Sequence, residues 1–144
     1  SNLEQFLCTI NFQYEVKRIQ QFPQQIEKSL SQMIQEIESV KNQGQKVVLY
    51  GAGNRAVILL NYALKDYIDF VVDDQPEKQN RLIPCCHTPV YSSEALYDSQ
   101  IGLCLLAVGG EIEPIVIQRH QALFDRIRVR SVLAPYLSQQ GEKK

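Results

Sequence analysis

The fold of this chain is decided by residues 46–56, Lys46-Val47-Val48-Leu49-Tyr50-Gly51-Ala52-Gly53-Asn54-Arg55-Ala56. An unbroken apolar run that ends at a glycine is typical of a parallel strand that is covered on both faces. The residues after it match G-x-G-x-x-[GA], which predicts a tight turn from a strand into a helix. The first glycine permits the turn, the second lets a ligand approach the backbone, and the small third residue lets helix and strand pack together.

Strands and helices are expected to alternate downstream of this turn. Further strands are predicted at residues 68–72, 90–91, 103–107 and 128–132, and helices at residues 54–64, 92–96 and 113–124. The second of these helices is expected to be capped by Ser92 or Ser93. Residues 76–89 are polar and bounded by prolines, so a loop is expected there. This order predicts a Rossmann-like α/β domain over residues 46–137, with a doubly wound parallel sheet of about five strands.

Residues 1–45 are predicted to form an N-terminal helical segment. Apolar residues recur at spacings of three and four, at Ile26, Leu30, Met33, Ile37 and Val40. This spacing indicates one face of a long amphipathic helix. Pro23 suits its first turn, and Gly44 suits a left-handed C-terminal cap. Residues 138–144 are expected to be a disordered tail.

Composition excludes several classes of protein. The chain has 144 residues, 44% of them hydrophobic, and a formal net charge of −1. That size fits one domain with its own core, and the charge gives no basic face for nucleic acid. No apolar run is long enough to span a membrane. The opening Ser1-Asn2 resembles a remnant of tag cleavage, so an excised fragment of a longer chain is expected.

The four cysteines are Cys8, Cys85, Cys86 and Cys104. They form no C-x-x-C pair and lack the spacing of zinc ligands, so no metal site is predicted. With no visible signal peptide, they are expected to be unpaired thiols of a cytoplasmic protein.

The glycine turn is the candidate ligand site. Its exposed N–H groups and the start of the following helix attract phosphate. Asp73, twenty residues after Gly53, ends the second strand, where a carboxylate can accept hydrogen bonds from ribose hydroxyls. This is also the NAD pattern. The alternative is that the glycines serve only the strand-to-helix turn.

The other polar residues near the turn allow two interpretations each. Arg55 can pair with a phosphate or be a solvated helix residue, and the cations Lys78 and Arg81 can face the turn or simply be solvated. His87 can donate to a ligand or be structural. Asp74 is expected to cap the turn that follows it rather than to bind ligand. No nucleophile–base pair is evident, so no catalytic residue is predicted.

Two stretches resemble one known family. Tyr50-Gly51-Ala52 followed by Leu59-Leu60-Asn61-Tyr62 resembles the Y-G-A…L-L-N-Y signature of the C-terminal domain of sugar C-methyltransferases. The family's pattern D-x-x-P-x-K-Q-x-R-x-x-P-x-x-H-x-P is matched at identical spacing from Asp73 to Pro89. The chain departs from the family at Gly53, where proline is usual, at Arg55, where lysine is usual, and at Asn80 and Cys85, which replace glycines.

The resemblance implies a larger enzyme with an N-terminal zinc region and a central domain that binds S-adenosylmethionine. The C-terminal domain then helps to hold a nucleotide-linked deoxysugar against that central domain and carries no catalytic residue or cofactor itself. The candidate binding residues are those of the motif and of the family signatures: Gly51, Ala52, Gly53, Asn54, Arg55, Asn61, Tyr62, Asp73, Lys78, Gln79, Arg81 and His87.

The sequence therefore supports three hypotheses about function. The first is a non-catalytic, substrate-side domain whose partners are a nucleotide-linked sugar and a methyltransferase domain in cis. The second is a stand-alone module that binds NAD(P) or a nucleotide-sugar. The third is a degenerate domain that is kept for assembly through its long helix. None of them involves nucleic acid or a membrane as a partner.

Overall fold

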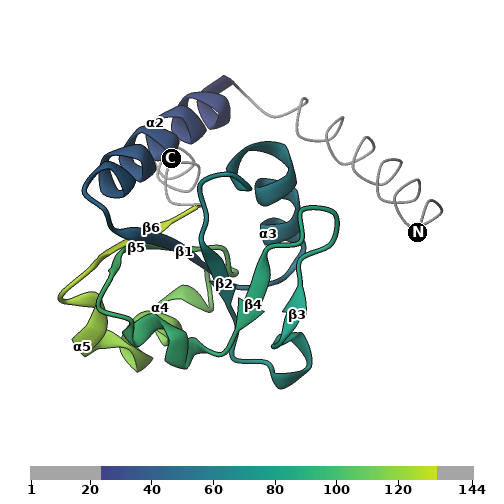
Figure 1. Cartoon of the computed structure of the whole chain (residues 1–144), viewed down its shortest axis with the longest axis vertical. Helices are drawn as coiled ribbons and strands as arrows, with labels where there is room; N and C mark the ends of the chain where they lie inside the picture. The colour runs from purple at the N-terminus through teal and green to yellow at the C-terminus, as the bar shows by residue number, and fades with distance from the viewer. Residues whose placement is uncertain (1–23, 133–144) are drawn as a thin grey trace.

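The computed structural model of the chain describes residues 24–132 (Figure 1). Its centre is β1 (Lys46–Tyr50), which pairs in parallel with a strand on each side. The whole sheet has six strands in the order β3-β4-β2-β1-β5-β6. The other strands are β2 (Phe70–Val72), β3 (Arg81–Leu82), β4 (Pro89–Tyr91), β5 (Ile101–Leu106) and β6 (Arg128–Ser131). The chain builds the sheet outward from β1 on one side and then crosses to β5 on the other, which confirms the doubly wound Rossmann-like fold.

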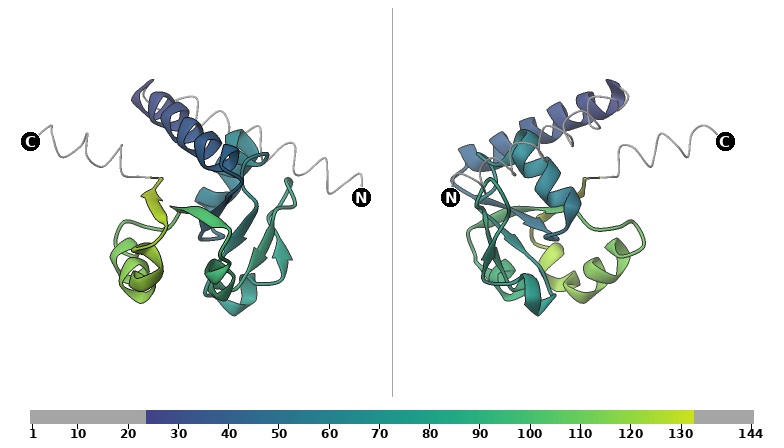
Figure 2. Two further views of the ribbon diagram at one scale, coloured as in Figure 1. Left: turned by 60° about the vertical axis from the view of Figure 1, so that its left-hand side comes forward. Right: turned by 90° about the vertical axis from the view of Figure 1, so that its right-hand side faces the viewer.

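Helices cover both faces of this sheet (Figures 1 and 2). One layer contains α2 (Gln24–Asn42), α3 (Asn54–Leu59) and the π-helix η1 (Leu60–Leu64). The other contains the 3-10 helix η3 (Ser93–Tyr97), α4 (Glu113–Arg119) and α5 (Gln121–Phe124). A further 3-10 helix, η2 (Pro76–Lys78), lies in the loop after β2.

Strand side chains alternate between these two layers. On β1, Val47 and Leu49 pack on the α2–α3 layer, whereas Val48 and Tyr50 pack on the α4–α5 layer. All six residues of β5 are buried. This burial on both faces is why the strands read as continuous apolar runs in the sequence.

The predicted amphipathic helix is α2. Ile37 and Val40 lie in the core, and Gly44 has a φ of 78°, as expected for a left-handed cap. Lys41 pairs with Asp69 at 2.8 Å, which fixes the end of the helix against the start of β2. The predicted positions of Pro23 and the tail 138–144 lie outside the described residues, as does the whole segment before α2.

The predicted loop 76–89 contains a strand that the sequence did not indicate. β3 runs antiparallel to β4 and makes six strands rather than about five. The fold-back depends on three residues in the left-handed region, Asn80, Cys85 and His87, with φ values of 60°, 74° and 61°. Two of them replace family glycines, so the chain keeps a backbone geometry that glycine adopts more easily.

Two predicted helices are interrupted. The helix predicted over residues 54–64 becomes a π-helix after Leu59, and the one predicted over residues 113–124 breaks at His120, whose φ is −118° and ψ is 30°. Cys85 is disulfide-bonded, so the prediction of four unpaired thiols is wrong at that position. Among residues 24–132, no helix has the length and apolar content that crossing a bilayer requires.

Candidate ligand-binding site

A pocket of about 350 Å³ opens where β1, β2 and β5 end. This is the edge at which the strand order reverses, the usual position of ligands in open α/β sheets. The order of the strands therefore predicts the place of the pocket independently of any motif. Half of the twelve predicted binding residues line it: Gly51, Ala52, Gly53, Arg55, Asp73 and Lys78.

The two glycines of the turn have different structural roles. Gly51 has a φ of 108°, and a Cβ there would lie 2.9 Å from the carbonyl oxygen of Ala107. Gly53 has an extended backbone with a φ of −90°. The nearest atom to a Cβ at Gly53 is Nζ of Lys78, at 4.0 Å. The fold therefore requires glycine at position 51, whereas the space over Gly53 belongs to the pocket.

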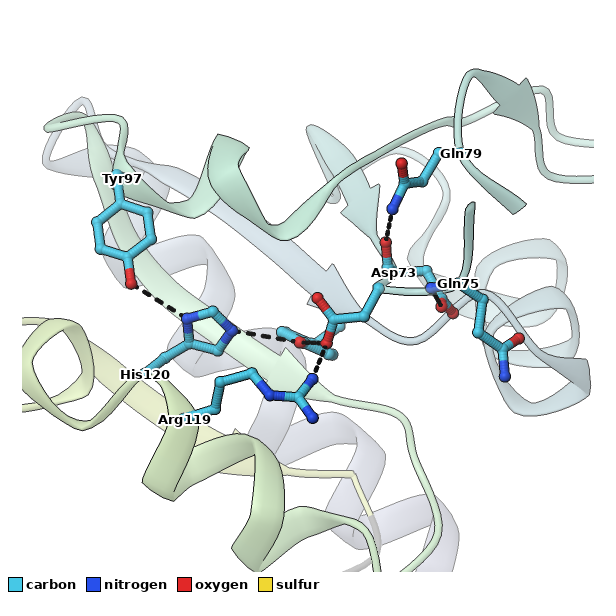
Figure 3. Close-up of polar contacts among 8 residues, drawn as sticks. Asp73, Gln75, Gln79, Tyr97, Arg119 and His120 are labelled. Carbon is cyan, nitrogen blue, oxygen red and sulfur yellow. Dashed lines mark hydrogen bonds and ion pairs between the residues drawn. The ribbon is translucent and has the colours of Figure 1, made fainter. Parts of the chain in front are cut away.

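Asp73 shapes the turn from the end of β2. It is 9% exposed. Its Oδ2 accepts a hydrogen bond from the backbone N–H of Ala52 at 2.8 Å, and its Oδ1 accepts one from the N–H of Gln75 at 2.8 Å. The side-chain amide of Gln79 donates to the Asp73 carbonyl at 2.9 Å (Figure 3). These contacts connect the glycine turn to the loop after β2.

The remaining predicted residues do not line the pocket. The side-chain amide of Asn61 donates to the carbonyls of Val57 and Pro84, at 2.8 and 3.0 Å, which ties the helix to the loop. Arg81 and His87 are exposed residues of β3 and the bend that follows it. Three further predicted residues, Asn54, Tyr62 and Gln79, do not line the pocket either. Binding roles for all six remain predictions from the resemblance.

The opposite wall of the pocket contains residues that the sequence did not single out (Figure 3). We call Tyr50, Asp74, Tyr97, Arg119 and His120 the Asp74 cluster. Arg119 donates to Oδ2 of Asp74 at 2.6 Å, and the Tyr50 hydroxyl donates to the same oxygen. The His120 ring lies between two hydroxyls, with Nε2 3.4 Å from Tyr50 and Nδ1 3.2 Å from Tyr97. The expectation that Asp74 caps the following turn is wrong, because the backbone N–H of Gln75 donates to Asp73 instead.

Burial sets the protonation of this cluster. It raises the pKa of the Tyr50 hydroxyl, and the hydrogen bond to Asp74 raises it further. Burial also lowers the pKa of His120, and this outweighs the opposing charge of Asp74. For Asp74, burial raises the pKa, but hydrogen bonds from Ser93 and Tyr50 and the charge of Arg119 outweigh it, so the pKa is lowered. At neutral pH the cluster holds a carboxylate, a neutral imidazole and a neutral phenol.

The predicted capping role of the serines before η3 is not observed. Ser92 precedes the helix and makes no side-chain capping hydrogen bond. Ser93 bonds to Asp74 instead. One signal for the second wall was present in the sequence: Ile112, Ile115 and Arg119 recur at helical spacing after the fourth predicted strand, and all three line the pocket.

The cations of the pocket differ in their partners. Arg119 pairs with Asp74, whereas neither Arg55 nor Lys78 has a carboxylate within ion-pair distance anywhere in residues 24–132. The glycine-turn side is therefore available to an anion, and the Asp74 side carries its own counter-charge. Within the described part of the chain, no group of three or more His, Cys, Asp or Glu side chains is placed to hold a metal ion.

The sheet order defines a Rossmann-like domain, with a pocket at the carboxyl edge of its sheet. The chain belongs to the family described as the C-methyltransferase C-terminal domain, which matches residues 11–126. This match confirms the resemblance seen in the sequence. No curated protein matches the chain.

Two similar solved structures are those titled as RSP in complex with β-NADH and as RSP, a Rex-family repressor. Each is 15% identical to the chain, with TM-scores of 0.48 and 0.49. The alignments cover 69% and 81% of this chain. The chain spans 59% and 66% of those two proteins, so neither match extends over their full length.

Proposed function

We propose that this chain is the substrate-side domain of an S-adenosylmethionine-dependent C-methyltransferase, and that it binds a nucleotide-linked sugar in the pocket. The observation that carries the proposal is that Arg55 and Lys78, which have no carboxylate partner among residues 24–132, lie beside the open space over Gly53. A diphosphate bridge needs such cations and close approach to the backbone. The pocket volume falls within the range of small-molecule sites.

We assign the chemistry of methyl transfer to another domain. The only described histidine near the pocket, His120, is 7% exposed and is held between two tyrosine hydroxyls, so it does not face the ligand. S-adenosylmethionine would bind a methyltransferase domain in cis, and this chain would hold the sugar against it. We therefore expect no methyl transfer by the isolated chain in a radiolabelled methyl assay.

A second candidate is a module that binds NAD(P). The extended backbone at Gly53, with open space above it, favours close approach of a dinucleotide. Against it, Asp73, which stands at the ribose-binding position of such modules, is only 9% exposed and its carboxylate holds two backbone N–H groups of the turn, so it offers a ligand little access. We therefore prefer the nucleotide-sugar.

The two candidates separate in a thermal-shift panel of NAD, NADP, S-adenosylmethionine and the uridine, guanosine and thymidine diphosphate sugars. A ligand present at one hundred times its Kd adds about 2.7 kcal/mol to the free energy of unfolding, or roughly 8 °C for a chain of this size. We expect this rise with a nucleotide-sugar. A rise with NAD or NADP alone would favour the second candidate. An unmoved melting temperature throughout the panel would contradict both and favour an assembly role.

A further inference from the structure

The two adjacent carboxylates at the end of β2 are held in different ways. Asp73 is 9% exposed, and each of its oxygens accepts one backbone N–H at 2.8 Å. Both oxygens of this carboxylate therefore hold the backbone of the turn in place. The Asp74 side chain is 32% exposed and lines the pocket. Both carboxylates line the pocket, and Asp74 is the one with the more exposed side chain.

Asp74 keeps acceptor capacity after its protein contacts are counted. A carboxylate offers about four lone-pair positions. Tyr50 and Arg119 occupy two of them, both on Oδ2, and the hydroxyl of Ser93 occupies a third. At least one position therefore remains for a donor in the pocket.

The buried part of the cluster fixes the direction of this carboxylate. Tyr50 is 3% exposed and His120 is 7% exposed, so this hydrogen-bonded pair lies behind Asp74 and away from solvent, and the exposed Tyr97 contacts the far side of the His120 ring. Two aromatic contacts hold the imidazole in place. The ring centroids of Tyr50 and His120 are 5.9 Å apart, and those of His120 and Phe124 are 6.0 Å apart. Such a support preorganises a binding group, because it leaves little freedom to lose when the ligand binds.

We propose that Asp74, rather than Asp73, is the residue that recognises the hydroxyl groups of a polyhydroxylated ligand, with Arg119 beside it as the donor to an oxygen of the same ligand. The inference rests on the proposed function and adds to it a binding residue and an orientation. Phosphates lie against Arg55 and Lys78, because the charge of Arg119 on the other wall is already neutralised by Asp74. The hydroxyl-bearing part lies against Asp74 and Arg119.

Titration calorimetry with two kinds of probe tests this orientation. The probes are the glucose esters of uridine, guanosine and thymidine diphosphate, which carry phosphates and hydroxyls, and inorganic pyrophosphate, which carries phosphates alone. The variants are Asp74→Asn and its matched neighbour Asp73→Asn, with Arg55→Ala as the phosphate-side variant. Asp74→Glu, which keeps the charge but moves the carboxylate, serves if Asp74→Asn does not fold.

We expect Asp74→Asn or Asp74→Glu to weaken the binding of a nucleotide-glucose at least tenfold, and to leave the affinity for pyrophosphate unchanged or higher. Asp73→Asn should change the nucleotide-glucose Kd by less than threefold, and Arg55→Ala should weaken both probes. Unchanged nucleotide-glucose affinity in the Asp74 variants, or a larger loss in Asp73→Asn, overturns this inference and leaves the proposed function standing. Binding of pyrophosphate alone by the wild type also overturns it. If the wild type binds none of the probes, this inference and the proposed function are both contradicted.

Discussion

The two walls of the pocket are built in different ways. The glycine wall comes from one continuous stretch, Gly51 to Arg55, with Lys78 above it. The Asp74 cluster is assembled from segments around residues 50, 74, 97 and 120. The first wall is encoded by local backbone requirements, and the second exists only once the sheet and the three helices of its layer are in place. Sequence patterns consequently identify the first wall and miss the second.

The largest expected change is a loss of stability, and it distinguishes the two glycines of the first wall. We expect Gly51→Ala to lower the free energy of unfolding by about 3 kcal/mol, because the new methyl group meets the Ala107 carbonyl and the φ of 108° is strained for any other residue. The same change at Gly53, with a φ of −90° and open space, should alter stability by less than about 1 kcal/mol. Urea unfolding of the two variants measures the difference. Equal losses would contradict separate roles for the two glycines.

The next largest expected change in stability distinguishes the carboxylates of Asp73 and Asp74. Asp73→Ala removes the acceptor of two backbone N–H groups and should cost about 2 kcal/mol of stability. Asp74→Ala leaves Arg119, which is half exposed and can bond to water, and Tyr50, whose hydroxyl keeps His120 within reach, so about 1 kcal/mol is expected. Thermal unfolding of both variants at the same pH gives the comparison. A greater loss at Asp74 would show that the cluster, not the turn, holds this edge together.

A pH effect reports on the cluster alone. Burial lowers the pKa of His120, so the unfolded chain takes up its proton first as the pH falls. The contribution of the neutral imidazole is fully present above the unfolded pKa of about 6.5 and is lost as the pH falls below it. The corresponding loss from Asp74, whose pKa is lowered, begins only near pH 4.

Unfolding measured between pH 7 and pH 5 should therefore show a decline in the wild type that is reduced in His120→Asn. His87→Asn is the matched control, because His87 is exposed and lies away from the cluster, with a left-handed backbone that asparagine adopts readily. If His120→Asn declines as steeply as the wild type, burial of the imidazole is not the cause.

The smallest expected effect lies in the loop beside the first wall. Asn80 has a φ of 60°, is exposed, and donates its backbone N–H to the Val90 carbonyl at 2.8 Å. Asn80→Gly should raise stability by up to about 1 kcal/mol through relief of the left-handed backbone, and Asn80→Ala should lower it by about as much. Matched denaturant curves measure both changes. A loss in the glycine variant would mean that the asparagine side chain, not its backbone, supports the loop.

Much of the fold could be predicted from the sequence. Apolar strands buried on both faces and helices at regular spacing each carry a local signal, and the predicted strand positions match β1, β2, β4, β5 and β6 to within two residues. The antiparallel strand β3 could not be predicted in this way. Its pairing depends on left-handed backbone at Asn80, Cys85 and His87. A glycine in the sequence indicates that such a backbone is possible, whereas these residue types do not.

The candidate site was predicted only in part for a similar reason. The glycine turn and Asp73 follow from a motif with fixed spacing, whereas His120 joins the Asp74 cluster at the point where the predicted helix breaks, with its ring between Tyr50 and Tyr97. Asn61 matched the family pattern, yet its amide bonds to two backbone carbonyls. A conserved-looking spacing can therefore reflect the shape of a loop as well as contact with a ligand.

The most direct test of the central claim is a calorimetric titration of Gly53→Val with the nucleotide-sugar that most stabilises the wild type. Valine fits the extended backbone at this position and points into the pocket, so we predict a folded protein with no measurable binding. Arg126→Ala, an exposed change away from the pocket, should bind as the wild type does. A folded Gly53→Val protein with wild-type affinity would contradict the assignment of the glycine turn as the ligand site.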